Sequence, residues 1–137
     1  MSEQDNVSLV KQAYNNFKAG NISALLELFA DDVQWQFPRI ENVPFAKAFN
    51  GRAGVGEFFA LVGANQDALS FEPQEFIAQD DKVVATGHYR WRIKTNNREF
   101  EGDWAHVFTI RDGKIAAFQE YTDTAAVADA YRKAMSA

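Results

Sequence analysis

The sequence contains no cysteine and only two histidines. The absence of cysteine excludes disulfides, thiol nucleophiles and cysteine metal sites. Two histidines leave little material for a histidine-based metal site. Nothing in the sequence requires a nucleotide, so we expect no metal and no cofactor.

Positive charge is also scarce, because 14 Lys and Arg residues face 19 Asp and Glu residues and the formal net charge is −5. This balance argues against nucleic acid or an anionic membrane surface as the main partner. No apolar run approaches the roughly 18 residues that a spanning helix needs. The first residues, MSEQDNVS, lack the form of a signal peptide. We therefore expect a cytoplasmic protein.

Aromatic residues are abundant, at 14% of the chain, with 12 Phe, 3 Trp and 4 Tyr. Such a surplus indicates either a large core or an aromatic-lined pocket. The length of 137 residues suits one domain, 1–137, and no repeat or linker divides it.

The periodicity of apolar residues predicts helices first and strands afterwards. A second helix, which Asn21 can cap, carries the stripe Ile22, Leu25, Leu26 and Phe29 and is expected to end at Asp31 and Asp32. The expected helices are 4–18, 22–32, 53–64 and 125–135, and the expected strands are 33–37, 69–79, 82–95, 98–110 and 114–122. This order favours an α+β fold in which a curved antiparallel sheet covers helices on one side.

The segment 39–50 is unusually apolar for a loop, with Ile40, Val43, Phe45 and Phe49. One interpretation is a flap packed over the core. The alternative is a lid on a pocket mouth or a dimer contact.

A hairpin is predicted around Asn96-Asn97, because asparagine tolerates the positive φ of a two-residue turn. This turn would pair Arg90 with Asp103, Arg92 with Glu101 and Lys94 with Glu99 on one face. The opposite face is apolar apart from His106 and carries Tyr89, Trp91, Ile93, Phe100, Trp104, Phe108 and Ile110.

The second turn, around Asp112-Gly113, allows either two or three loop residues, and the two choices place Glu120 on opposite faces. We favour the three-residue turn with Gly113 in a bulge. It would place Glu120 opposite Trp104, diagonal to His106, at roughly 5–8 Å.

The order of these elements and their punctuating motifs resembles the NTF2-like superfamily, and within it the SnoaL-like polyketide cyclases and the relatives of ketosteroid isomerase. The matching segments are Ala-Gly-Asn at 19–21, Leu-Phe-Ala-Asp-Asp at 28–32 with Val33 and Trp35 after it, the helix start at 51–59, Asp-Gly-Lys-Ile at 112–115 and Phe-Gln-Glu-Tyr at 118–121. The resemblance implies a conical barrel, an apolar cavity closed by helices, and dimers that form through the sheet. Such proteins include isomerases, cyclases, epoxide hydrolases, dehydratases and binding proteins, so fold alone does not give function.

By position, His106 and Glu120 match the histidine and the acid that SnoaL-like cyclases place in the cavity, with Glu here in place of Asp. The sequence departs more strongly from the ketosteroid isomerase pattern. Phe37 stands at the position of the Asp base and His106 at the position of the oxyanion donor. Tyr14 is offset by one residue from the tyrosine of the first helix. The segment 82–94 also lacks the Asp that epoxide hydrolases of this superfamily need.

We therefore predict an acid–base pair of His106 and Glu120, acting on an apolar carbonyl compound as in isomerases, cyclases or hydratases. The predicted ligand-binding residues around it are Tyr14, Trp35, Phe37, Tyr89, Trp91, Trp104, Phe108 and Phe118. Two alternatives stay open, a non-catalytic carrier of small ligands and an accessory dimeric module. His106 could also be a core histidine bonded to a backbone carbonyl or to Tyr14.

On the outer face of the sheet, Val84, Thr86, Ala105 and Val107 form a mildly apolar patch that is a candidate homodimer surface. His88 is expected on the same face, opposite Ala105, with a pKa near the ordinary value of about 6.5.

Overall fold

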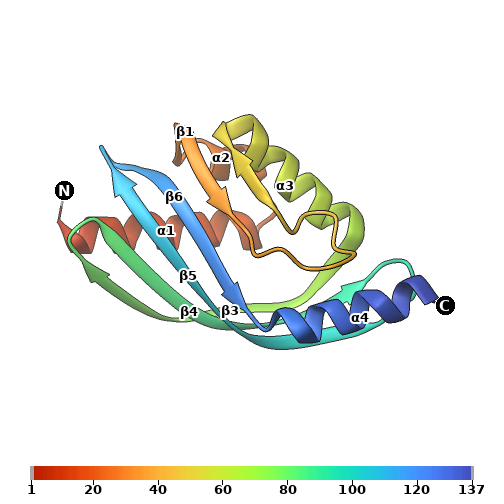
Figure 1. Ribbon diagram of the computed structural model, residues 1–137. Helices are drawn as coiled ribbons and strands as arrows, with labels where there is room; N and C mark the ends of the chain where they lie inside the picture. The colour runs from red at the N-terminus through yellow and green to blue at the C-terminus, as the bar shows by residue number, and fades with distance from the viewer. Residues whose placement is uncertain (1, 137) are drawn as a thin grey trace.

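The computed structural model describes residues 2–136 and side chains as far as Arg132. One six-stranded sheet, in the order β2-β1-β6-β5-β4-β3, curves around the helices on its concave side (Figure 1). The elements are α1 (Glu3–Lys18), α2 (Ile22–Leu26), β1 (Phe29–Gln36), β2 (Ala48–Asn50), α3 (Gly51–Asn65), β3 (Gln66–Gln79), β4 (Lys82–Ile93), β5 (Glu99–Arg111), β6 (Lys114–Thr122) and α4 (Thr124–Ser136). The α+β class is therefore confirmed.

The sheet is mixed and open, where the sequence predicted an antiparallel one. β1 runs parallel to β6, pairing Trp35 with Phe118, while the other neighbouring strands are antiparallel. β2 and β3 remain as edges, so the cone does not close.

Capping side chains and a glycine set the ends of the first two helices. Ser2 caps α1 by accepting a hydrogen bond from the Asp5 amide, and the Asp5 carboxylate accepts one from Ser2 in return. Gly20, with a φ of 76°, allows the turn between α1 and α2, and the Asn21 side chain caps α2.

Asp31 and Asp32 do not end α2, as predicted, but lie within β1. The helix stops after Leu26 and the strand begins at Phe29. Both carboxylates point away from the core into ion pairs, Asp31 with Arg52 and Asp32 with Arg111. Phe29 and Val33 on the same strand are fully buried.

The hairpin between β4 and β5 has a four-residue turn at 94–97, where a two-residue turn was predicted. The Ile93 amide donates to the Arg98 carbonyl, and the Asn97 amide donates to the Ile93 carbonyl. Within this turn, Asn97 alone has a positive φ, 64°. The register therefore shifts by two residues, which pairs Arg90 with Glu101 and Arg92 with Glu99. Because the shift is even, every side chain keeps its predicted face.

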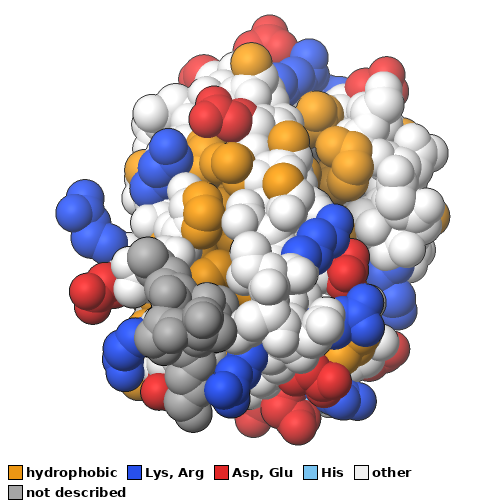
Figure 2. Space-filling view, turned by 90° about the vertical axis from the view of Figure 1, so that its right-hand side faces the viewer, with side chains coloured by type: hydrophobic (Ala, Val, Ile, Leu, Met, Phe, Trp, Pro, Cys, Tyr) orange, Lys and Arg blue, Asp and Glu red, His pale blue; other side chains and the backbone are white. Residues whose placement is uncertain are grey.

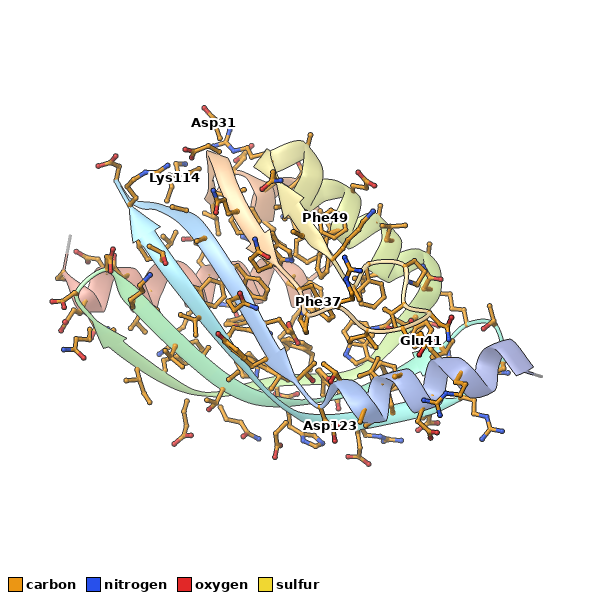
Figure 3. All side chains as sticks on the ribbon, viewed as in Figure 1. Asp31, Phe37, Glu41, Phe49, Lys114 and Asp123 are labelled. Carbon is orange, nitrogen blue, oxygen red and sulfur yellow. The ribbon has the colours of Figure 1, made fainter. Side chains whose placement is uncertain are left out.

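The segment 37–47 packs as a flap over the core, and its residues Ile40, Val43 and Phe45 are buried. Figure 3 shows Phe37 at the start of this segment among the side chains that fill the concave side of the sheet, with Glu41 further along it. Burial agrees with the interpretation as a packed flap, although 48–50 form β2 and not a loop. Phe45 also lines the cavity beneath the flap, so the alternative of a lid stays a prediction.

Candidate functional site

His106 on β5 and Glu120 on β6 lie directly opposite each other in the sheet. The turn between the strands has two residues, Asp112 and Gly113, with φ of 53° and 73°, so the predicted three-residue turn is wrong. A bulge further along β6 leaves Ile115 and Ala116 both facing inward. This extra residue returns Glu120 to the inner face, so that the pair is closer than the predicted diagonal.

A chain of polar contacts runs from α1 across both strands. The Tyr14 hydroxyl lies 2.6 Å from Nδ1 of His106, and Nε2 of His106 lies 2.7 Å from Oε1 of Glu120. The Nε2–H direction does not follow the line to Glu120, so this second contact has the length of an ion pair without the alignment of a hydrogen bond. Nε2 thus has no aligned hydrogen-bond partner among the described residues, but it is fully enclosed, so a ligand atom reaches it only when neighbouring side chains move.

These three groups are shielded from water, with His106 only 5% exposed and Glu120 only 6%. Burial, and secondarily the charge of Glu120, raise the pKa of Tyr14 far above its ordinary value. Tyr14 thus keeps its proton at physiological pH. A hydroxyl that keeps its proton can donate to Nδ1 in the tautomer that carries the ring proton on Nε2, next to Glu120.

The polar chain borders a cavity of about 90 Å³ lined by residues from all four helices. Of the predicted ligand-binding residues, the cavity walls include Tyr14, Trp35, Phe37, Tyr89, Trp91, Phe108 and Phe118. Whether these residues bind a ligand stays a prediction. The volume lies below the roughly 300–1,000 Å³ typical of ligand pockets, so a larger ligand requires side chains to move.

Trp104 is the predicted ligand-binding residue that is not part of the cavity wall. Its indole stacks under the His106 ring at 4.0 Å between centroids and on Phe71 at 5.0 Å. Trp104 is buried as predicted, and its indole contacts two residues of the cavity wall, His106 and Phe71, without being part of that wall.

Sequence reasoning missed the polar pair of Gln66 and Tyr131 at the cavity. Gln66 begins β3 and lines the cavity, and the Tyr131 hydroxyl of α4 donates to it. The strand was predicted to begin at 69, which left Gln66 in an unassigned linker. A glutamine directly after an apolar helix was the only signal available. The further aromatic cavity residues that were not predicted as ligand-binding are Phe17, Phe29, Phe45, Phe58, Phe59, Phe71 and Phe100.

His88 lies on the outer face as predicted, but opposite Asp103 and with an altered pKa. Its Nδ1 is 2.8 Å from Asp103 and its Nε2 is 2.9 Å from Glu101. Hydrogen bonds to these two carboxylates, Asp103 first, raise the pKa of His88 above 6.5. The expectation of an ordinary value is therefore wrong, because the shifted register brings both acids to this imidazole.

Within residues 2–132, no three His, Asp or Glu side chains gather closely enough to hold a metal ion. Across the part of the chain that the structure describes, the helices are too short or too polar to span a membrane.

Comparison with known proteins agrees with this architecture. The family model described as SnoaL-like domain matches residues 10–118. An NTF2-like protein from Burkholderia xenovorans LB400 is 35% identical, with 96% of this chain and 98% of that chain covered and a TM-score of 0.87. Among curated proteins, none matches the chain.

Two further solved structures are similar over nearly the whole chain. TerC, co-crystallised with polyporic acid, is 27% identical, with 93% of this chain and 98% of that chain covered and a TM-score of 0.84. An NTF2-like protein of unknown function from Burkholderia pseudomallei K96243 is 24% identical, with coverages of 96% and 98% and a TM-score of 0.84. This last likeness shows the fold alone.

Proposed function

Because the chain belongs to the SnoaL-like domain family of NTF2-like proteins, we propose that it is a cofactor-independent enzyme that transfers a proton on an apolar carbonyl compound. The observation that carries this proposal is the buried contact between His106 and Glu120 at the wall of an aromatic cavity. One of two such groups can accept a proton from the substrate while the other donates a hydrogen bond to it, which is what general acid–base catalysis needs.

In the proposed reaction, Glu120 removes a proton from the carbon next to the substrate carbonyl. The electrons of the broken C–H bond form the C=C bond of an enolate, and the negative charge develops on the carbonyl oxygen. The Nε2–H group of His106 donates a hydrogen bond to that oxygen. Glu120 then returns the proton to carbon, at the same or a conjugated position.

Tyr14 and Trp104 act on this chemistry through His106. The Tyr14 hydroxyl fixes the tautomer that carries the proton on Nε2, and the Trp104 indole restricts the ring plane. The surrounding aromatic rings exclude water, which strengthens electrostatic contacts in the cavity.

A second candidate function is that of a non-catalytic carrier of small ligands. The Tyr14 bond already satisfies Nδ1 of His106, as in an ordinary core histidine. The relative TerC was co-crystallised with polyporic acid, which indicates that the fold at this level of similarity accepts a small organic molecule. A carrier would bind such a compound without exchanging its protons.

Deuterium exchange separates the two functions. With β-tetralone in deuterated buffer, we expect the protein to accelerate loss of the proton signals next to the carbonyl in NMR spectra. Glu120→Gln should slow the protein-dependent exchange by about a hundredfold or more, since a positioned general base contributes roughly 10²–10⁴. His106→Asn should slow it as well.

The matched control is Glu27→Gln, which removes an exposed carboxylate from the end of α2. It should leave exchange unchanged. Exchange that is equal in the wild type and Glu120→Gln, together with β-tetralone binding, would identify a carrier and reject the enzyme.

We also propose that two copies pair through the outer face of the sheet. Ile77, Val84 and Val107 form a continuous row across β3, β4 and β5 on this face, and Ile77 is 62% exposed.

A further inference from the structure

The cavity has a second polar position in addition to His106 and Glu120. Gln66 is only 5% exposed and lines the cavity. The buried Tyr131 hydroxyl donates to its Oε1 at 2.6 Å. Burial raises the pKa of Tyr131, so this hydroxyl keeps the proton that it donates.

One end of the Gln66 amide is bonded to Tyr131 and the other is free. Among the described residues, no acceptor lies within hydrogen-bond distance of the Gln66 amide nitrogen. This nitrogen is also not one of the fully enclosed polar atoms that lack a partner, so part of its surface stays accessible. Should the amide be turned over, its oxygen would face the same space.

The two polar positions lie toward opposite ends of the cavity. Phe71 on β3 lies 6.4 Å from the His106 ring, measured between centroids. Gln66 precedes Phe71 by five positions on the same strand, which is roughly 16 Å at about 3.3 Å per residue. Between them the wall is aromatic, with Tyr89 and Trp91 from β4 and Phe100 from β5.

The charge of the cavity limits what the distal position can bind. No Lys or Arg belongs to the cavity wall among the described residues, while Glu120 contributes a carboxylate. A carboxylate or phosphate on the ligand would therefore meet no counter-charge in an apolar environment, which is costly. A neutral oxygen, such as a carbonyl, hydroxyl or ether, suits an amide N–H donor.

We propose that Gln66, held in place by Tyr131, binds a neutral oxygen atom at the far end of the ligand. The ligand class is then an elongated, uncharged, apolar molecule with one oxygen at the reacting carbonyl and a second at the opposite end. This inference rests on the proposed function, because it takes the dyad of His106 and Glu120 as the other binding position.

The test compares diols with matched mono-alcohols of increasing length. The probes are hydroquinone against phenol, a naphthalenediol with hydroxyls at opposite ends against naphthol, and a biphenyldiol of the same kind against phenylphenol. Isothermal titration calorimetry gives the dissociation constant of each. In the wild type, we expect one length at which the diol binds roughly two- to tenfold tighter than its mono-alcohol, because the second hydroxyl adds one neutral hydrogen bond.

We define the diol advantage as the dissociation constant of the mono-alcohol divided by that of the matched diol. In Gln66→Met this ratio should fall to about one, since methionine keeps the volume but offers no N–H donor. Tyr131→Phe keeps both ends of the amide but removes its anchor, so part of the advantage should remain. The matched control is Gln74→Met, an exposed glutamine on the same strand, which should leave the advantage unchanged. Circular dichroism confirms that each variant is folded.

Two outcomes would overturn the inference: no diol binds better than its mono-alcohol in the wild type, or the advantage persists in Gln66→Met. If Gln66→Met does not fold, Tyr131→Phe decides, because an unchanged advantage there contradicts an amide that depends on Tyr131. Failure of the proposed function has a separate signature. In that case Glu120→Gln leaves β-tetralone exchange unchanged, whatever the diols show.

Discussion

At the scale of single residues, the candidate site depends on Tyr14, the only described side chain that bonds Nδ1 of His106. Tyr14→Phe removes the hydroxyl and leaves a buried ring nitrogen without a partner. We expect the free energy of unfolding to fall by about 1–3 kcal/mol, the cost of an unsatisfied buried polar group. Urea denaturation followed by tryptophan fluorescence measures the change.

The control for this variant is Tyr121→Phe, which removes a hydroxyl from a side chain that is 57% exposed on β6. Surface changes of this kind stay within about 0.5 kcal/mol. If both variants lost the same stability, or neither lost any, the bond between Tyr14 and His106 would not be a stabilising contact in solution.

At the scale of strands, Gly87 on β4 allows Trp104 to reach its position behind His106. A Cβ atom at Gly87 would collide with the Trp104 ring and with the Glu72 carbonyl of β3. Gly87→Ala should therefore lower the free energy of unfolding by about 1–3 kcal/mol, as expected of overpacking. It should also slow deuterium exchange, because the displaced indole moves His106.

The contrasting substitution is Gly63→Ala in α3, where an added Cβ meets nothing within 4 Å. Alanine in a helix is favoured over glycine by roughly 0.5–1 kcal/mol, so this variant should be more stable than the wild type. Urea denaturation of both variants checks the pair. Equal effects at the two positions would show that β4 and β5 adjust to relieve the collision.

The faces of the strands could be predicted from the sequence, whereas the turns that join them could not. Alternation placed His106, Phe108 and Trp104 on the inner face, and burial keeps them there because a one-residue slip would expose them all. The predicted register of β4 and β5 was wrong by two residues. An even shift leaves the same side chains buried, so burial does not distinguish the two registers. Its charge pairs carry little energy on the surface and did not select the register.

The His106 and Glu120 pair was predicted on one face, but by the wrong turn. A two-residue turn alone would have put Glu120 outside, and the bulge at Ala116 compensates. A bulge has no sequence signal as clear as Asp-Gly, since it arises when packing favours two successive inward residues. Gln66 and Tyr131 were missed for a related reason, because their contact joins segments that only the folded topology brings together.

At the scale of the whole molecule, charged side chains of β4 and β5 form a ladder beside the apolar row of Ile77, Val84 and Val107 on the outer face. Figure 2 shows another face, at the end of the molecule where the C-terminus lies, on which hydrophobic side chains are also visible between charged ones. On the outer face of the sheet, the apolar residues Ile77, Val84 and Val107 align across three neighbouring strands. Such an alignment suits a self-complementary contact between two copies.

Ile77→Asp should convert the proposed dimer to a monomer without unfolding it, since Ile77 is already exposed in one chain. Sedimentation velocity should show a dissociation constant at least about tenfold higher, equal to about 1.4 kcal/mol. Leu69→Asp changes another exposed apolar residue of β3 and should leave the dimer intact. A wild-type protein that sediments as a monomer at high concentration would reject this surface.

The parallel pairing of β1 with β6 also has a consequence for the order of folding. Trp35 meets its neighbour Phe118 more than eighty positions later in the chain, so β1 cannot join the sheet until β6 has been synthesised. The hairpins of β3, β4, β5 and β6 need only local contacts. Because distant contacts are slow to form, the cavity is completed late, and the hairpin of β1 and β2 waits for β6 before it joins the rest of the sheet.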